Sequence, residues 1–291
     1  MTPYATLGWL RALAGTFGGQ GLIHEMDLGC RYVMPMLAGG TLAPGSFASG
    51  AIGYGGVYQE GQAVYDPAVI GDALRAAERE LGLPCHRLVL PPTDRACAES
   101  VASAPANIRA TQVKKLPAAN AVMIPTYRPT LRNEVRAVLA DKEVVTSPLG
   151  LGDRHGAVDL VHRTQRRVSS AYLSPEKLVD AFLNDTSGFF RGFGCWHRGQ
   201  LASVGFFLVT PTESAYYLNG WDDAARHARP NVAMLHHAFS WLAAQGVRQV
   251  DLGYSHSVGV DNAKSRWGTE RQFFVTCDAS DTAFLASGGR P

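Results

Sequence analysis

Residues 215–268 read AYYLNGWDDAARHARPNVAMLHHAFSWLAAQGVRQVDLGYSHSVGVDNAKSRWG. The stretch opens in a strand predicted at residues 214–218. It continues into a helix predicted at 229–246, where apolar side chains recur at helical spacing. A second strand is predicted at 249–252. Strand, long helix and strand in this order indicate an α/β protein.

The segments around this stretch also alternate between helical and strand patterns. Predicted strands at 189–197 and 200–209 are separated only by Arg198-Gly199, which indicates a tight hairpin. Asp66 and Ser174, each followed by proline, are expected to cap two helices. The remaining predictions are helices at 4–14, 66–81, 131–141, 158–169 and 175–183, strands at 86–90, 119–124 and 271–276, a hairpin over 24–37, glycine-rich loops at 39–58 and 144–157, a short segment at 262–267 and a tail that frays from residue 279.

The composition favours a globular protein that works in the cytoplasm. The chain has 291 residues, enough for one large or two mid-sized domains, and 46% of them are hydrophobic. A net charge of +2 argues against a protein whose main task is binding DNA. The five cysteines include no C-x-x-C pair, so neither a disulfide framework nor a zinc site is expected. No signal peptide or membrane-spanning apolar run is predicted.

Four short motifs in the opening stretch carry a family resemblance. They are Gly220-Trp221-Asp222, Arg229-Pro230-Asn231, Gly246 to Asp251-Leu252-Gly253, and Lys264 followed by Trp267-Gly268. With these motifs the segment resembles the C-terminal half of Fem-type (FemAB-like) proteins of the GNAT superfamily. The resemblance implies an α/β fold of two GNAT-like halves, at residues 1–125 and 126–291. Each half would hold a mixed, mostly antiparallel twisted sheet flanked by helices, and the second half would carry the catalytic motifs.

The same resemblance implies an N-acyltransferase that forms an amide bond by direct attack of an amine. Some members take an aminoacyl group from aminoacyl-tRNA, for cell-wall cross-bridges or peptide antibiotics, and others use acyl-CoA. The glycine-containing phosphate loop of CoA-dependent members is absent before the long helix, where Arg229-Pro230-Asn231-Val232 stands instead. The sequence also lacks a long charged helical pair, which favours antibiotic assembly over the cell wall. We therefore expect aminoacyl-tRNA as donor, a small-molecule or peptide amine as acceptor, and no bound cofactor. An acyl-CoA-dependent enzyme and a non-catalytic GNAT-like scaffold are the alternatives.

Three residues of the motif block are the predicted catalytic groups. Lys264 would stabilise the developing oxyanion or bind a phosphate, unless it is an ordinary solvated lysine. Asp251, placed at a strand end, would accept a proton from the amine or orient it, unless it only caps a turn. Tyr254 would donate a hydrogen bond from the loop that follows. His256, on the same loop, could do the same.

Further residues are predicted to bind substrate. Asn231 and Arg229 lie at a helix N-terminus, where free N–H groups and a partial positive charge suit phosphate or carbonyl oxygen. The other predicted substrate-binding residues are Tyr54, Tyr217, Asn219, Trp221, Ser255 and Trp267. Four arginines on two helices are candidates for the donor phosphate or tRNA, with a solvated helical face as the alternative: Arg132, Arg136, Arg166 and Arg167.

Other chemistries fit less well. His236 and His237 are adjacent on a helix and point to different sides, which is poor geometry for a metal, so no metal site is expected. Cys195 and His197 alternate along a strand, but a core cysteine beside an edge histidine is a commoner arrangement than a nucleophile. The glycines at 150 and 152 lack the third glycine of a dinucleotide loop.

Overall fold

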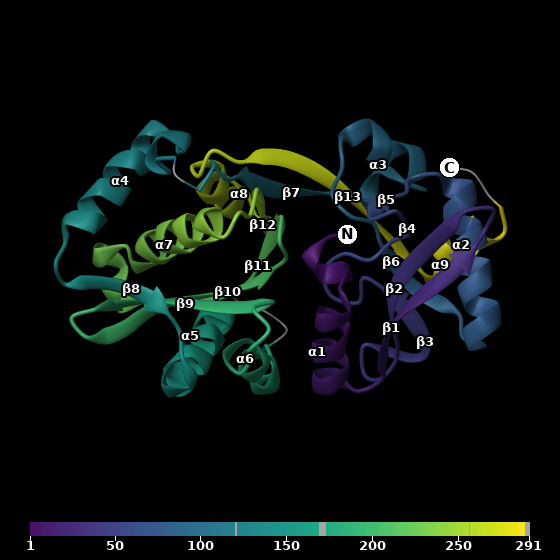
Figure 1. The fold of residues 1–291 in the computed structure, drawn as a ribbon, viewed down its shortest axis with the longest axis horizontal. Coiled ribbons are helices and arrows are strands. Elements are labelled where there is room, and N and C mark those ends of the chain that lie inside the picture. The colour runs from purple at the N-terminus through teal and green to yellow at the C-terminus, as the bar shows by residue number, and fades with distance from the viewer. Residues whose placement is uncertain (120, 169–172, 256, 289–291) are drawn as a thin grey trace. The chain divides into compact units, whose positions relative to one another are not determined.

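The computed structural model describes residues 1–119, 121–168, 173–255 and 257–288. The chain forms two compact units (Figure 1): unit 1 comprises Met1–Thr111 with Arg271–Pro291, and unit 2 comprises Gln112–Glu270. This division differs from a single boundary at residue 125, because the chain returns to unit 1 at its end. There β13 (Glu270–Asp278) pairs antiparallel with β6 (Cys85–Val89), which fixes the last segment to the first unit.

Unit 1 contains a mixed sheet in the order β5-β4-β2-β3-β6-β13, with β1 paired to β2. β3 and β6 run parallel, whereas β1–β2, β2–β3 and β6–β13 are antiparallel. Helix α1 packs against β1 and β2, and α9 packs against α2 and β6. The elements are η1 (Pro3–Ala5), α1 (Leu7–Phe17), β1 (Gln20–Asp27), β2 (Arg31–Gly39), β3 (Ala43–Ser49), β4 (Tyr58–Gln59), β5 (Gln62–Ala63), α2 (Pro67–Leu81), β6, α3 (Arg95–Val101), η2 (Pro105–Asn107), β7 (Ile108–Lys115), β13 and α9 (Ala279–Ala286).

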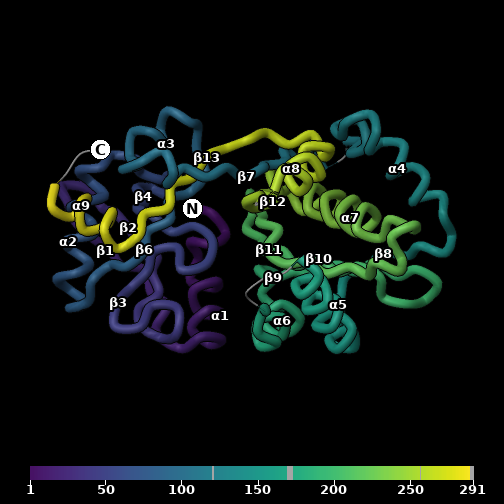
Figure 2. The backbone as a smooth tube through the Cα atoms, turned by 180° about the vertical axis from the view of Figure 1, so that it is seen from behind, coloured from purple at the N-terminus to yellow at the C-terminus, as the bar shows by residue number. Residues whose placement is uncertain are grey.

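Unit 2 contains a second set of strands, in the order β7-β12-β11-β10-β9-β8, of which β7 begins in unit 1 and ends in unit 2. β8, β9, β10 and β11 are antiparallel neighbours, and β11 runs parallel to β12. Helices α7 and α4 lie on one side of this sheet, and α5 and α6 lie on the other (Figure 2). The elements are η3 (Ile124–Thr126), α4 (Pro129–Ala140), β8 (Val144–Pro148), η4 (Leu151–Asp153), α5 (Arg154–Arg167), α6 (Glu176–Leu183), β9 (Phe190–His197), β10 (Gln200–Val209), β11 (Glu213–Trp221), η5 (Asp223–Ala228), α7 (Pro230–Ala244), β12 (Gln249–Tyr254) and α8 (Val258–Ser265).

The two units repeat one arrangement, as the GNAT-like duplication predicted. In unit 1 the antiparallel strands β1, β2 and β3 are followed by the crossover helix α2 and the parallel strand β6. In unit 2 the antiparallel strands β9, β10 and β11 are followed by α7 and the parallel strand β12. The α/β fold of two mixed, mostly antiparallel sheets flanked by helices is therefore confirmed.

Local signals account for the elements that were predicted correctly. Asp66 caps α2 by accepting a hydrogen bond from Ala68 N at 2.8 Å, and the helix ends at Gly82 in the left-handed region. Arg198 and Gly199 both have positive φ, as the two-residue turn of the β9–β10 hairpin requires.

Several predicted elements were wrong. The expected loop at 39–58 contains β3, which pairs with β2 and β6, and the expected loop at 144–157 contains β8 and the start of α5. The strand predicted at 119–124 is absent among the described residues of that segment. The strand in this part of the chain is β7, which ends at Lys115. The tail forms α9, and the segment at 262–267 belongs largely to α8.

Ser174 was also predicted wrongly as the cap of α6. The helix has Pro175 at its N-cap position, with no capping side chain. The Ser174 hydroxyl instead accepts a hydrogen bond from Gln165 Nε2 at 2.8 Å.

The core of unit 2 is apolar and includes a buried cation. Phe207 and Phe239 pack between the sheet and α7, whereas Lys114 on β7 is 1% exposed. The Lys114 ammonium donates to Thr126 Oγ1 at 2.8 Å and lies 5.3 Å from the ring centre of Tyr127. Burial lowers the pKa of Lys114 to about 8, because it penalises the charged form. None of the helices in the described part of the chain combines the length and apolar character needed to cross a membrane.

Candidate active site

Unit 2 contains a pocket where its two parallel strands separate. β11 pairs with β12 from Glu213 to Ala215, and the described residues show no further pairing between these strands although β11 continues to Trp221. The wedge between the strands opens into a pocket of about 630 Å³, which is closed by the start of α7 and by α8. Strand ends that diverge in this way leave backbone and side-chain groups available for a ligand.

The pocket changes in polarity from floor to rim. Leu235, Leu252 and Trp267 are 4 to 5% exposed and line its floor. Arg226 and Arg229 are exposed and line its outer part. A ligand with an apolar group at one end and negative charge at the other matches this gradient.

Lys264 lies in this pocket, on α8. Its ammonium donates to the carbonyl oxygens of Gly253 at 2.7 Å and Tyr254 at 2.9 Å. An ammonium has three N–H donors, so these two contacts with described residues leave one for a ligand. Burial lowers the pKa of Lys264 to about 8, and the nearby charges of Asp251 and Asp261 act in the opposite direction.

The other two predicted catalytic residues lie beside Lys264 and do not line the pocket. Asp251 lies within β12 and not at its end, contrary to the prediction, and its Oδ1 accepts a hydrogen bond from Gly253 N at 2.7 Å. Tyr254 ends β12 with a side chain that is 47% exposed, and its backbone carbonyl binds Lys264. Ser255 follows with a buried hydroxyl that has no hydrogen-bond partner among the described residues, and His256 lies outside those residues.

Asn219 and Trp221, both predicted to bind substrate, line the pocket, but Tyr217 does not. The β10–β11 register shifts so that Phe206 faces Leu218 while Phe207 faces Tyr216, which leaves Tyr217 as the extra residue of a bulge. The bulge turns the Tyr217 ring to the other face of the sheet, where it stacks on Phe182 of α6 at 5.9 Å.

Tyr216 takes the place predicted for Tyr217, and the sequence reasoning missed it. Its hydroxyl is buried in the pocket beside Asn219, without a hydrogen bond of ordinary geometry among the described residues. Burial raises the pKa of this hydroxyl, so Tyr216 stays protonated at neutral pH. A neutral hydroxyl in a largely apolar pocket is a ready hydrogen-bond donor for one polar atom of a ligand.

The start of α7 differs from a phosphate-binding helix terminus. Asn231 and Arg229 line the pocket, but Pro230 has no N–H group. The N–H groups of Val232 and Ala233 are directed to the carbonyl of Arg229, which has a left-handed backbone. In the first turn, this leaves the N–H of Asn231 as the donor for an anion.

The predicted arginines do not form one patch. Arg167, at the end of α5, lies 4.1 Å over the ring of Trp221 and lines the pocket. Arg132 donates to the backbone carbonyls of Tyr127 and Pro125, and Arg136 donates to Asn133. Arg166 is exposed on α5 outside the pocket. Tyr54, which was predicted to bind substrate, lies in unit 1 and packs edge-on against Tyr4 and Phe274.

We expect Arg167→Ala to raise the donor KM about tenfold, because it removes a cation fixed at the pocket on Trp221. Arg166→Ala is the matched control on the same helix and should change KM less than about twofold. Steady-state kinetics at a fixed acceptor concentration measures both. Equal effects of the two substitutions would show that the position of Arg167 over Trp221 does not matter.

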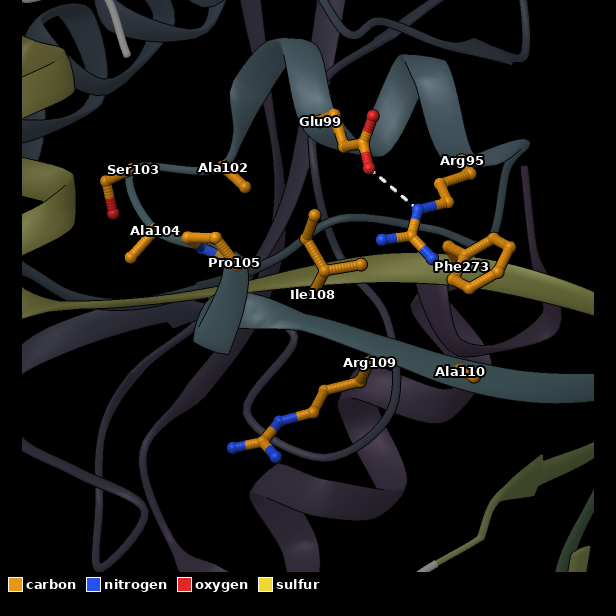
Figure 3. Close-up of a pocket in the computed structure, with 10 residues that line it drawn as sticks. All are labelled: Arg95, Glu99, Ala102, Ser103, Ala104, Pro105, Ile108, Arg109, Ala110 and Phe273. Atoms are coloured by element: carbon orange, nitrogen blue, oxygen red, sulfur yellow. Dashed lines mark hydrogen bonds and ion pairs between the residues drawn. The ribbon is translucent and has the colours of Figure 1, made fainter.

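A second pocket, of about 420 Å³, lies in unit 1 (Figure 3). Its charged groups do not converge. Arg95 bonds to Glu99 at 2.7 Å and covers the ring of Phe273, while Arg109 extends away from them. In the described part of the chain, no three His, Cys, Asp or Glu side chains gather closely enough to ligate a metal. The pocket of unit 2, with Lys264 and Tyr216, is therefore the better candidate active site.

Comparison with known proteins identifies a domain within the chain. Residues 125–265 match the model of the acetyltransferase (GNAT) domain family. No curated protein matches the chain in sequence. Residues 125–265 are thus a GNAT acyltransferase domain, and they include Lys264, Leu235 and Leu252 but not Trp267.

Solved structures share the fold over nearly the whole chain. A FemX crystal structure is 11% identical, with a TM-score of 0.63, and the match covers 93% of this chain and 91% of that one. The C-terminal domain of a protein named as a lysylphosphatidylglycerol synthetase, from Agrobacterium fabrum, is 12% identical, with a TM-score of 0.56 and coverage of 98% and 91%. L-PGS from Bacillus licheniformis is 12% identical, with a TM-score of 0.53 and coverage of 92% and 90%. The chain therefore has the two-unit fold of the Fem-like proteins, as the sequence resemblance predicted.

Proposed function

We propose that the protein moves an aminoacyl group from aminoacyl-tRNA to the amine of a small molecule or peptide, as in peptide-antibiotic assembly. The name lysylphosphatidylglycerol synthetase denotes attachment of a lysyl group, which is an aminoacyl group, and that protein has this fold. Such a donor would place the reaction in the cytoplasm.

The observation that carries the choice of donor is the start of α7. A CoA diphosphate bound at a helix N-terminus needs several free backbone N–H groups. Here Pro230 supplies none, and those of Val232 and Ala233 are directed to Arg229 O. Exposed Arg226 and Arg229 instead supply separate cations along the outer part of the pocket. Separate cations suit the spaced phosphates of a nucleic-acid strand better than one diphosphate.

The reaction itself needs no covalent enzyme intermediate. The acceptor nitrogen attacks the ester carbonyl of the aminoacyl group, the C–N bond forms, and the bond to the ribose oxygen breaks. The nitrogen loses one proton, and the departing ribose oxygen gains one. Lys264 would donate its remaining N–H to the carbonyl oxygen as negative charge develops there. Tyr216 lines the same pocket and would supply a second donor or protonate the leaving oxygen.

Transfer from charged tRNA gives the direct test of this proposal. The protein is incubated with a mixture of charged tRNAs and a panel of amines, and amide products are identified by mass spectrometry. Product that disappears when the tRNA is first digested with RNase supports the proposal. Product that forms equally well after RNase treatment would refute it.

An acyl-CoA donor is the second candidate, because residues 125–265 match a family described as acetyltransferase. Isothermal calorimetry with CoA and acyl-CoA at millimolar concentration tests this alternative. Heat of binding that is lost in Asn231→Asp would favour CoA, since a carboxylate at that position repels a phosphate. Absence of heat together with RNase-sensitive transfer would favour tRNA.

The pKa of Lys264, lowered to about 8, predicts a pH dependence. The ammonium is charged below this pKa and loses its proton above it, so its contribution should fall about tenfold for each pH unit beyond about 8. Lys264→Arg keeps its charge throughout this range. The ratio of wild-type to Lys264→Arg kcat/KM should therefore fall as pH rises from 7 to 9.5. Ionisation of the acceptor amine affects both proteins and cancels in the ratio, so a flat ratio would contradict a charged role for Lys264.

A further inference from the structure

We propose that the transferred acyl group is bulky and apolar, such as a leucyl, phenylalanyl or other large hydrophobic group. The inference rests on the proposed function only in placing acyl transfer in the pocket of unit 2. It specifies which substrates that pocket selects.

The floor and walls of the pocket have the character of a hydrophobic binding site. Leu235, Leu252 and Trp267 are almost fully buried beneath it, and Val232 and Trp221 form its sides. A large apolar group would lose its own contact with water against this floor and would cover the partly exposed Val232 and Trp221, whereas an alanyl or acetyl group has less apolar surface to bury. Hydrophobic pockets discriminate by about tenfold or more for each methylene that fills them.

A positively charged acyl group would find no counter-ion in the pocket. Among the described residues that line it, Glu134 is the only carboxylate, and it is already paired with Arg266. The other charged lining groups are cations, including Lys264, Arg167 and Arg229. A lysyl side chain would therefore lose hydration and meet like charges, which disfavours it strongly.

A competition experiment with the full chain tests this selectivity. A tRNA pool charged with all amino acids is offered together with one acceptor, and in parallel a mixture of acetyl-, hexanoyl- and phenylacetyl-CoA is offered. Mass spectrometry identifies the groups that are transferred. We expect leucyl or phenylalanyl products to exceed alanyl and lysyl products by about 100-fold, or the larger acyl groups to exceed acetyl by a similar factor.

The outcomes separate this inference from the proposed function. Large apolar groups transferred only from CoA would support the inference and refute the tRNA donor. Alanyl, lysyl or acetyl groups transferred at least as well as large ones would overturn the inference and leave acyl transfer intact. No product from either donor class would overturn both.

Two neighbouring residues on α8 provide matched variants. Ala263 lines the pocket and Asn262 does not, and both are exposed, so neither substitution disturbs the core. We expect Ala263→Trp to fill the pocket and lower the preference for large over small groups at least tenfold. Asn262→Trp should leave the preference unchanged. Val232→Phe fills the pocket from α7 as an independent check, and an unchanged preference in both pocket variants would overturn the inference.

Discussion

Lys264→Ala is expected to lower kcat/KM for acyl transfer by about 100-fold to 1,000-fold, which is typical for loss of a donor to a developing oxyanion. The ammonium is held by the carbonyls of Gly253 and Tyr254, so its position in the pocket is fixed before substrate binds. A donor fixed in advance needs no reorganisation during the reaction. Steady-state kinetics with saturating acceptor measures the change.

A structural role for Lys264 has to be separated from a chemical one. The side chain links α8 to the end of β12, so its loss could loosen both elements. The melting temperature and donor Kd of Lys264→Ala supply the control. A large fall in kcat with little change in either supports a catalytic role, whereas activity within twofold of wild type would contradict it.

Gly268→Ala is expected to destabilise the protein by about 2 to 5 kcal/mol. Gly268 has a φ of +71°, and a Cβ there would collide with the carbonyl oxygen of Thr126. Left-handed backbone costs a residue with a side chain about 1 to 2 kcal/mol, and overpacking adds about 1 to 3 kcal/mol. The Thr126 carbonyl cannot move freely, because the same residue binds buried Lys114. Urea unfolding measures the free energy of unfolding.

Gly246→Ala is the matched control for this substitution. Gly246 also lies in unit 2 with a positive φ of +85°, but nothing lies within 4 Å of its potential Cβ. The free energy of unfolding of Gly246→Ala should therefore fall only by the cost of the left-handed backbone, about 1 to 2 kcal/mol. Equal losses at the two positions would show that the contact with Thr126 is not the cause.

The elements that were predicted correctly from the sequence are those with a clear local pattern, such as an apolar helix face or a short turn. Helix α7 has a continuous apolar face, and the β9–β10 hairpin has a two-residue turn. The missed strand β3 is rich in small residues and becomes a strand because β2 and β6 pair with both of its edges. The return of β13 to unit 1 likewise depends on pairing with β6, far away in the sequence, so no local pattern reports it.

In the candidate site too, residues with a local sequence signal were predicted, and those that depend on strand pairing were not. The motif block led to Asn219, Trp221, Asn231, Lys264 and Trp267, all of which the fold brings to one pocket. Tyr217 was predicted in place of Tyr216, and the bulge that decides between them depends on pairing with β10, which the sequence of β11 does not report.

The basic helices misled for a related reason. Arg132 and Arg136 form hydrogen bonds within their own segment, and Arg167 is singled out by its position over Trp221. A count of charges along a helix does not distinguish these environments.

Hydrogen–deuterium exchange with a non-hydrolysable donor tests the central claim, that acyl transfer occurs in the wedge between β11 and β12. The full chain is compared with and without an amide-linked aminoacyl-RNA minihelix, and in parallel with a non-hydrolysable acyl-CoA. We expect protection of residues 216–221 and of α8 by one of these ligands. Protection confined to unit 1, around Arg95 and Ile108, would contradict it.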